Sequence, residues 1–277
     1  MTPALNFHGD VTITVTVTDD GGLSDDTDFV LTVNPVADTP GITGTTTLED
    51  IQSDTGLVIT RNTVDGEEVT HFKITDITAG TVYQNDGTTQ ITDDDFITYD
   101  EGNAGLKFSP KGDYNGTASF KLQASLSAVD GGLGGAEVTA SIAVTAVNDV
   151  PSFTVGSDQT VLEDGGSQTV SNWATALSTG PSDESGQTLT FNMSGINAGL
   201  FAVQPAVSSA GELSYTPADN VHGSDTVTVT LSDDGGTDNG GVDTSVPQTF
   251  IVTIDPVADT PSINGTTTLE DTQSDAG

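Results

Sequence analysis

The sequence has no cysteine and very few basic residues. Its 277 residues include 5 Lys and Arg against 41 Asp and Glu, which gives a formal net charge of −36. The absence of cysteine excludes disulfides and thiolate metal sites. The shortage of cations argues against nucleic acid as a partner, because phosphate binding needs clustered Lys and Arg. An anionic membrane surface is disfavoured for the same reason.

Long apolar runs and a leader segment are also missing. No stretch approaches the ~20 apolar residues needed to cross a bilayer. The N-terminus, MTPALNFHGD, has neither the basic nor the apolar region of a signal peptide. We therefore expect no membrane insertion in this segment, and we interpret the chain as an internal fragment with an added Met1.

The few cations are confined to one internal stretch, at Arg61, Lys73, Lys107, Lys111 and Lys121. Most of the carboxylates therefore have no Lys or Arg available to neutralise them. Two interpretations remain open, a solvated acidic surface or bound cations. Self-repulsion between so many carboxylates destabilises a compact state, and divalent ions are the simplest remedy.

The sequence is rich in repetition. The phrase NPVADTPGITGTTTLED at residues 34–50 returns as DPVADTPSINGTTTLED at 255–271, and a divergent copy, VNDVPSFTVGSDQTVLED, lies at 147–164. Gly9, Gly116 and Gly223 stand 107 residues apart within a second recurring phrase. A unit of about 110 residues that repeats in this way indicates stacked domains, each presenting the same face to its neighbour.

Within each unit, apolar residues alternate with Thr, as in DVTITVTVT at 10–18 and TVTVTLS at 226–232. Period two places one face in a core and the other in water. An acidic Gly-Gly turn and a second alternating strand follow, and the proline phrase comes next, which we interpret as a linker. About seven short strands per unit predict an all-β chain of tandem immunoglobulin-like (cadherin-like) Greek-key β-sandwiches in an elongated array.

This interpretation divides the chain into four segments. Residues 1–36 are the C-terminal strands of a partial repeat, 37–147 and 148–257 are complete repeats, and 258–277 begin a further partial repeat with its N-terminal strand. Long helical patterns are absent, and the closest candidate is the short stretch NWATALS at 172–178.

The order of these phrases resembles a known family. LED near the start of the unit, an acidic loop before QTLTF, then LSYTPADNVHGSDTVTVTLSDDGG and DPVADTP are similar to the bacterial cadherin-like, immunoglobulin-like tandem repeats of large repeats-in-toxin-type surface adhesins. The resemblance covers almost the whole chain, most closely residues 148–277. It implies tandem domains of an extracellular or bacterial cell-surface protein, such as those found in biofilms, and it specifies no activity.

The acidic residues suggest calcium, which takes six to eight oxygen ligands and needs no His or Cys. In an immunoglobulin-like domain the loops gather at two poles, so each junction should combine residues from one unit, the linker and the next unit. In cadherins, acidic residues from these same places bind calcium between domains, and this resemblance supports the grouping. We therefore predict structural calcium at the junctions between neighbouring repeats.

The predicted ligands fall into three sets, one for each junction. The central junction would use Glu49, Asp50, Asp113, Asn148, Asp149, Asp183, Glu184, Asp233 and Asp234. The first would use Asp38, Asp65, Glu67 and Asp130, and the third Glu163, Asp164, Asp219 and Asp259. The linkers depart from the cadherin pattern at Ala37 and Ala258, where the central linker has Asn148. The two outer junctions are therefore expected to bind fewer ions, to bind them more weakly or to bind none.

Other interpretations of these residues are open. Asp-Gly and Asp-Asp-Gly-Gly segments are also ordinary turn chemistry. Trp173 is the sole tryptophan, and it either packs in a sandwich core or stacks on a sugar. His8 and His222 occupy one place in two repeats where the middle copy has Asn115, which argues for a turn residue and against a catalytic base. We therefore expect no enzyme activity.

Two functions follow from these observations. The first is an extender in which calcium at the junctions stiffens an array that holds an adhesive tip away from the cell. The second is a ligand-binding module that recognises a surface glycan or protein through the loops of one unit. The confinement of the cations to residues 61–121 marks the unit at 37–147 as the better candidate for such binding.

Overall fold

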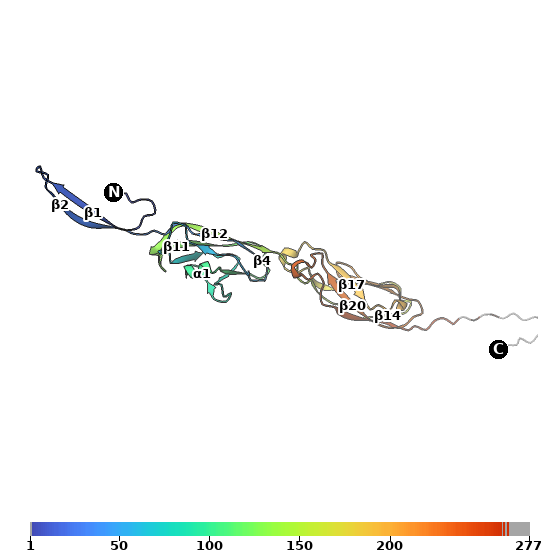
Figure 1. Cartoon of the computed structure of the whole chain (residues 1–277). Helices are drawn as coiled ribbons and strands as arrows, with labels where there is room; N and C mark the ends of the chain where they lie inside the picture. The colour runs from blue at the N-terminus through green and yellow to red at the C-terminus, as the bar shows by residue number, and fades with distance from the viewer. Residues whose placement is uncertain (1, 262, 264, 266–277) are drawn as a thin grey trace, which may run out of the picture. The chain divides into compact units, whose positions relative to one another are not determined.

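The structure is a computed structural model that describes residues 2–261, 263 and 265 of the chain. Most of the partial repeat predicted at 258–277 therefore lies outside the described residues. The chain divides into two compact units, Met1–Val147 and Asn148–Gly277 (Figure 1). Among the described residues, no helix has the length and apolar character needed to span a bilayer.

The first unit opens with a hairpin of two long strands, β1 (Gly9–Thr18) and β2 (Ser24–Val33), which pair antiparallel along their whole length. Asp19 closes the turn, because its side chain accepts hydrogen bonds from the backbone N–H groups of Gly21 and Leu23, both at 2.9 Å. An Asp side chain that bonds to nearby backbone N–H groups is a common turn device.

The rest of the first unit is a β-sandwich, called here the first sandwich. Its elements are β3 (Gly41–Ile42), β4 (Thr45–Leu48), β5 (Ile59–Thr60), β6 (His71–Thr75), β7 (Gly80–Tyr83), β8 (Gln90–Ile91), β9 (Phe96–Thr98), α1 (Tyr99–Asn103), β10 (Lys107–Pro110), β11 (Gly116–Ser125), the 3-10 turn η1 (Asp130–Gly132) and β12 (Leu133–Thr145). The main sheet has the order β4-β12-β11-β6-β9, and a second sheet has the order β10-β7-β8. Phe72, Phe108 and Phe120 are fully buried between the strands.

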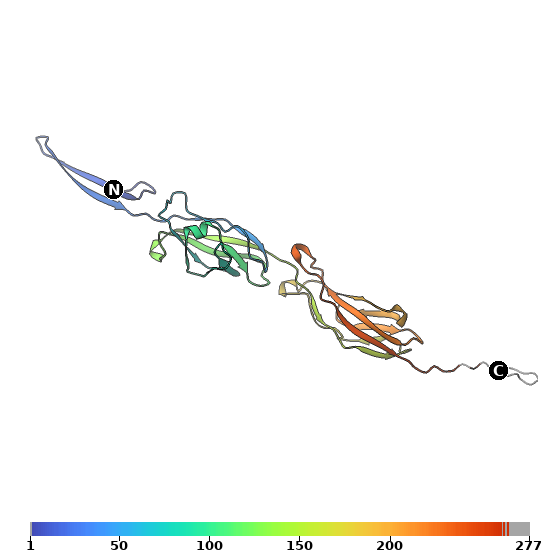
Figure 2. The same cartoon turned by 60° about the horizontal axis from the view of Figure 1, so that its bottom comes forward.

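The second unit contains the second sandwich. Its elements are β13 (Ser152–Thr154), β14 (Gln159–Leu162), β15 (Gln168–Val170), β16 (Thr175–Ser178), η2 (Ser182–Glu184), β17 (Thr190–Ser194), η3 (Ala198–Leu200), β18 (Phe201–Val207), β19 (Leu213–Pro217), β20 (Gly223–Ser232), η4 (Asp238–Gly240) and β21 (Gln248–Asp255). The sheets have the orders β14-β21-β20-β17 and β15-β19-β18. The long β20–β21 pair, orange to red in Figure 2, forms the centre of the larger sheet.

In both sandwiches, the first two strands pair into different sheets. In the first, β3 pairs antiparallel with β5, and β4 then pairs parallel with β12, with Leu48 beside Thr145. In the second, β13 pairs with β16 and β14 pairs parallel with β21, with Leu162 beside Asp255. Parallel pairing brings both chain segments to the same end of the sheet. The LED turn of each sandwich therefore lies where its last strand runs into the outgoing linker.

The prediction of an all-β fold with immunoglobulin-like sandwiches is confirmed. The core interpretation of Trp173 also holds, because its side chain is buried, stacks edge-on against Phe250 at 4.6 Å and donates its indole N–H to the Ser157 carbonyl at 3.0 Å. The stretch at 172–178 contains strand β16 instead of a helix.

The single α-helix within the described part of the chain, the short α1, was not predicted. A capping box marks its start, since the Thr98 side chain accepts from the Glu101 backbone N–H while the Glu101 carboxylate accepts from Thr98. The sequence Thr-x-x-Glu at 98–101 is the usual signal for this arrangement, and it was available in the sequence.

Candidate metal centre

The N-terminal pole of the second sandwich, the end at which the chain enters it, gathers polar side chains around the linker residues Asn148 and Asp149. The Asn148 side-chain amide donates to Asp233 Oδ1 and to the Val242 carbonyl, both at 3.0 Å, and its oxygen accepts from Gln187 Nε2 at 2.8 Å. The linker is therefore fixed to this pole by its first residue.

Asp149 extends this attachment through its backbone. Its N–H donates to Glu184 Oε1 at 2.8 Å. Glu184 stands in the turn η2 and is 7% exposed, and its second oxygen, Oε2, has no hydrogen-bond partner. Burial raises the pKa of Glu184, and the negative charges of Asp149, Asp183 and Asp233 raise it further. A buried, unpaired carboxylate oxygen of this kind is costly unless a cation or proton neutralises it.

Two consecutive acids follow strand β20 at the same pole. Asp233 accepts from Asn148 and from the Gly235 backbone N–H through Oδ1, while its Oδ2 is buried without a hydrogen bond. Asp234 is exposed and accepts from the Thr188 backbone N–H at 2.8 Å. Asp183 is also exposed, beside Glu184 in η2. Glu184 and Asp233 thus point carboxylate oxygens into the protein, and Asp183 and Asp234 lie on the surface around them.

The C-terminal pole of the first sandwich, where the chain leaves it, is built on the LED turn. Glu49 is 4% exposed, and its Oε1 accepts from the backbone N–H of Val147 in the outgoing linker. Its other oxygen, Oε2, is buried and has no hydrogen-bond partner. The buried Glu of LED therefore holds the linker through one oxygen and leaves the second oxygen available for a cation.

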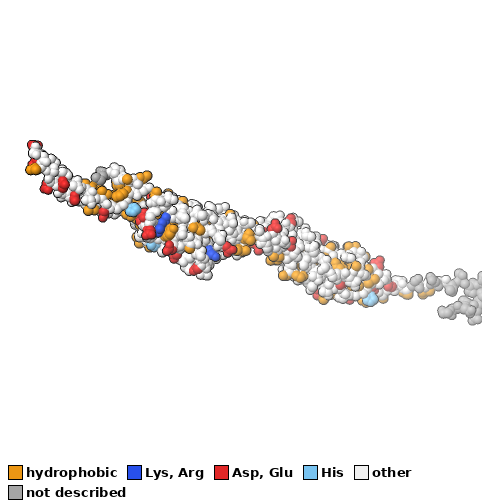
Figure 3. Space-filling view, in the orientation of Figure 1, with side chains coloured by type: hydrophobic (Ala, Val, Ile, Leu, Met, Phe, Trp, Pro, Cys, Tyr) orange, Lys and Arg blue, Asp and Glu red, His pale blue; other side chains and the backbone are white. Residues whose placement is uncertain are grey.

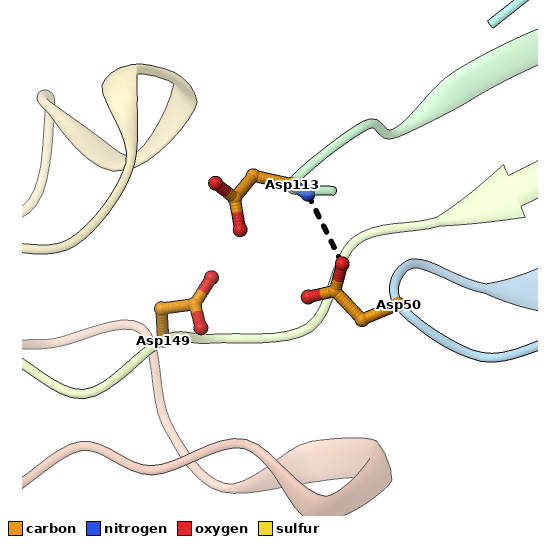
Figure 4. A group of neighbouring side chains, drawn as sticks. All are labelled: Asp50, Asp113 and Asp149. Atoms are coloured by element: carbon orange, nitrogen blue, oxygen red, sulfur yellow. Dashed lines mark hydrogen bonds between the residues drawn. The ribbon is translucent and has the colours of Figure 1, made fainter. Parts of the chain in front are cut away.

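Asp50 and Asp113 lie beside Glu49. The Asp113 backbone N–H donates to Asp50 Oδ1 at 3.1 Å, and Figure 4 draws this bond together with the linker residue Asp149. Both aspartates adopt positive φ, 57° for Asp50 and 56° for Asp113. Asp and Asn tolerate this region better than other non-Gly residues, which explains how two turns can present carboxylates close together.

The C-terminal pole of the second sandwich repeats this backbone arrangement. Glu163 is 5% exposed and accepts from the Val257 backbone N–H at 2.8 Å, and Asp164 Oδ1 accepts from the Asn220 backbone N–H at 3.0 Å. Asn220 thus takes the place of Asp113. The predicted ligand Asp219 is exposed one position earlier, and Asp259 lies in the linker.

The N-terminal pole of the first sandwich is different in composition. The Asp38 backbone N–H donates to both Asp65 oxygens at 3.2 Å, whereas the Asp149 N–H donates to a single oxygen of Glu184. Burial raises the pKa of Asp65, and the charges of Asp38 and Glu68 add to the effect. Ala37, however, is buried at 1% exposure, so the linker offers no side-chain ligand at the place of Asn148.

Two ligands predicted for this pole, Glu67 and Asp130, are exposed and form no hydrogen bond or ion pair with Asp38 or Asp65. Glu67 is exposed, while its neighbour Glu68 is the residue that affects Asp65. Asp130 is 72% exposed in its side chain and forms an ion pair with Lys73 at 2.8 Å. On the face in Figure 3 the Lys and Arg side chains lie over the first sandwich, in agreement with their confinement to residues 61–121.

Buried oxygen atoms without partners concentrate at the poles. Among the described residues, the side-chain atoms of this kind are Glu49 Oε2, Glu163 Oε2, Glu184 Oε2, Gln187 Oε1 and Asp233 Oδ2. Buried polar atoms are normally hydrogen-bonded, so this concentration needs an explanation. The donors are carboxylate and amide oxygens, which suit a hard cation such as calcium. The residues on either side of the central linker, Glu49, Glu184 and Asp233 among them, therefore fit the predicted ion.

Apart from Glu67 and Asp130, the predicted residues thus lie at these poles or in the linkers beside them, with three additions that the sequence did not single out. Glu68, Gln187 and Asn220 contribute to the poles through polar contacts. Repeat alignment supplies a signal for Asn220, because Asn220 and Asp113 each stand three positions before a repeat glycine. Gln187 and Glu68 lie in loops of differing sequence, where no such alignment was available.

The comparisons with known proteins agree with this architecture. A family model described as a bacterial Ig domain matches residues 148–245. The structure is similar to mouse Cadherin-23 EC22-24, with a TM-score of 0.50 and 15% identity over 93% of this chain and 78% of that one. It is also similar to human Protocadherin-24 EC1-2, with a TM-score of 0.50 and 11% identity over 78% of this chain and 99% of that one. No curated protein matches the sequence. These likenesses support a bacterial immunoglobulin-like domain with a cadherin-like fold.

Proposed function

We propose that this chain is an extender segment of a large secreted or cell-surface bacterial adhesin, in which calcium binds at junctions between domains and restricts their motion. The bacterial Ig-domain match and the cadherin-like fold support a segment of adhesin-type repeats. The observation that carries the calcium part is the set of buried, unpartnered carboxylate oxygens at the poles, above all Glu184 Oε2.

Chain connectivity supports a shared site at the central linker. Glu49 of the first sandwich holds the amide of Val147, and Glu184 of the second holds the amide of Asp149. These amides are two residues apart, and a residue spans at most ~3.6 Å. Whatever orientation the two units take, both carboxylates remain tied to this short linker. An ion near Asp149 would then be within reach of oxygens from both domains.

Electrostatics explains why calcium would restrict motion here. Without an ion, carboxylates carried by both domains close to this short linker would repel one another and favour separation. A divalent cation converts the repulsion into shared coordination, which holds both neighbours in one arrangement. Extracellular calcium-binding modules work with dissociation constants of 10⁻⁴–10⁻³ M, so weak sites suffice outside the cell.

Small-angle X-ray scattering of the whole chain, in calcium and in chelator at fixed ionic strength, tests this function. We expect a narrower distribution of interatomic distances in calcium, because the central linker becomes ordered. The variant Glu49→Gln with Asp149→Asn should lose this response. A matched control, Asp25→Asn with Asp28→Asn in the exposed strand β2, removes two charges far from the linker and should keep it. Identical curves for the unmodified chain in both buffers would contradict the proposal.

The alternative is a module in the first sandwich that binds a surface glycan or protein. The observation in its favour is that the chain's only Lys and Arg residues lie there. Two of them are already neutralised, however, since Lys73 pairs with Asp94 and Asp130 and Lys121 pairs with Asp76. A glycan array probed with the whole chain tests this function, and signal that disappears on replacing Lys107 and Lys111 with Ala would support it.

A further inference from the structure

The two C-terminal poles share one backbone arrangement but differ in several side chains, three of which bear on ion binding. At both, the LED glutamate accepts from a linker amide and the following aspartate accepts from the backbone N–H that lies three positions before the repeat glycine. The paired turns also have matching positive φ, 57° and 56° in the first sandwich and 59° and 55° in the second. Differences in binding between these poles must therefore come from side chains.

The first difference is that Asp113 of the first sandwich is replaced by Asn220 in the second. Asp113 adds a negative charge beside Asp50, and a cation bound there would relieve the repulsion between the two carboxylates. Asn220 is neutral, and in the amide orientation that satisfies its surroundings its Nδ2 donates to Asp259 at 2.9 and 3.2 Å. An N–H group donated to a carboxylate is a charge-assisted hydrogen bond. The outgoing linker is thus attached directly, without an ion.

The second and third differences act in the same direction. Asn115 is replaced by His222, whose Nδ1 lies 3.6 Å from Glu163 Oε2, the buried oxygen that has no hydrogen bond. A ring nitrogen is a poor ligand for calcium, which takes oxygen. In the linker, Ala258 stands where Asn148 stands before the second sandwich, so one side-chain oxygen is lost as well.

From these contacts we infer that Asn220 and His222 determine the ion occupancy of the C-terminal pole of the second sandwich. They close this pole through direct contacts with Asp259 and Glu163, and calcium is excluded. Asp113, which carries a carboxylate in place of the Asn220 amide, leaves the equivalent pole of the first sandwich open to calcium. The calcium half of this inference rests on the proposed function. The direct closure by Asn220 does not.

A third copy of the pattern in the same chain agrees with this division. The hairpin that precedes the first sandwich carries Asn6 and His8 at the positions of Asn220 and His222, and its linker has Ala37. His8 Nδ1 lies 3.9 Å from a Glu68 oxygen. Asn-x-His therefore occurs with the VADTP linker twice, and Asp-x-Asn occurs with VNDVP once. The chain contains two kinds of joint, one that needs an ion and one that does not.

Exchanging the residues between the two poles tests the calcium half of the inference. Isothermal titration of the whole chain with calcium gives the number of bound ions. The variant Asn220→Asp with His222→Asn should gain at least one ion, whereas Asp113→Asn with Asn115→His should lose one. The control Asp25→Asn with Asp28→Asn, which removes two exposed acids of strand β2, should leave the count unchanged. An unaltered count in both exchange variants would overturn the inference, and the dispersion of the amide signals in an NMR spectrum verifies that each variant is folded.

A second measurement tests the direct closure in the absence of calcium. NMR of the Asn220 side-chain amide in chelator should show slowed hydrogen exchange relative to a solvated Asn. The Asp259→Ala variant should abolish this protection. If the Asn220 amide exchanges as fast as an exposed one, the closure is wrong. If the closure is present but the unmodified chain binds no calcium, only the proposed function fails.

Discussion

The N-terminal pole of the second sandwich presents Asn148, Glu184 and Asp233, where the first sandwich presents Ala37, Asp65 and Leu126. Both attach the linker in the same way, through a backbone N–H bonded to a buried or half-buried carboxylate. Of these two N-terminal poles, only that of the second sandwich has buried carboxylate oxygens without a hydrogen-bond partner. The same backbone framework therefore supports an acidic pole in the second sandwich, where we propose that calcium binds, and a pole in the first sandwich with fewer oxygen-bearing side chains.

The first pole also has a cation of its own. Arg61 stands four residues before Asp65, as Gly180 stands four before Glu184. Its guanidinium covers the Tyr99 ring at 3.7 Å, and its Nε donates to the Val69 carbonyl at 2.6 Å. A Cβ at Gly180 would collide with Glu184 Oε2, so the second pole has no room for such a side chain. At the pole of the first sandwich, backbone hydrogen bonding from Gly66 lowers the pKa of Glu68 and the charge of Arg61 lowers it further. The pole of the second sandwich has no Arg or Lys at the matching position.

The largest effect is expected from Glu184→Gln, which removes a buried carboxylate from the N-terminal pole of the second sandwich. This variant should lose the calcium-dependent stabilisation of the second sandwich, which for a single site at 100 times Kd amounts to about 2.7 kcal/mol. In chelator it should be no less stable than the unmodified chain. Trp173 fluorescence during thermal unfolding reports on this sandwich. The matched change at the first pole, Asp65→Asn, should leave the calcium response intact, and loss of the response in that variant would contradict the comparison.

The second-largest effect on stability is expected from removing Arg61, the cation at the N-terminal pole of the first sandwich. Arg61→Leu should destabilise the first sandwich by about 2 kcal/mol, because it removes a cation–π contact and a hydrogen bond to a half-buried carbonyl. Hydrogen exchange of the amides of strand β6 measures the free energy of opening. Lys111→Ala, a truncation of an exposed cation, is the control and should change it by no more than about 0.5 kcal/mol. Equal effects of the two variants would exclude a special role for Arg61.

A smaller effect is expected from the linker residue that distinguishes the two poles. Asn148→Ala removes the side chain that bonds to Asp233, Val242 and Gln187. In chelator, this variant should lower the free energy of unfolding of the second sandwich by about 1–2 kcal/mol. Denaturant unfolding followed by Trp173 fluorescence measures it. Asn192→Ala, which removes an exposed bond to Ser232, provides the comparison. If both variants lose the same stability, Asn148 does not organise the pole.

The smallest effect is the pH dependence in chelator. Because the pKa of Glu184 is raised in the folded state, the folded state holds this proton more tightly than the unfolded chain does. The penalty from Glu184 is therefore present at neutral pH, and it disappears as the pH falls through the raised pKa toward 4.5. The stability difference between Glu184→Gln and the unmodified chain should shrink over this range, and a difference that grows would contradict the assignment.

Much of this architecture was accessible from the sequence because strands have a strict period. Alternation at 226–232 predicts strand β20 and its buried face, and Val227, Val229 and Leu231 are indeed fully buried. Loops lack such a period, so the sequence did not show that Glu68 faces Asp65 more closely than Glu67 does. The role of Asn220 depends on a hydrogen bond to the linker residue Asp259. A search of the sequence for acidic ligands does not find it, because Asn220 is not acidic. The helix α1 has only five residues and depends on the capping box at Thr98 and Glu101, so it lacks the long helical pattern by which a helix is predicted.

The most direct test of the central claim is a calcium titration of the ¹⁵N-labelled whole chain followed by NMR. The account predicts that the amide signals of Val147, Asp149 and Gly235 shift and saturate, because these N–H groups bond to the carboxylates of Glu49, Glu184 and Asp233. The amides of Asp38 and Val257, at the other two linkers, should stay in place. Uniform, unsaturated shifts at all three linkers would contradict the account, since they would indicate screening of a solvated acidic surface.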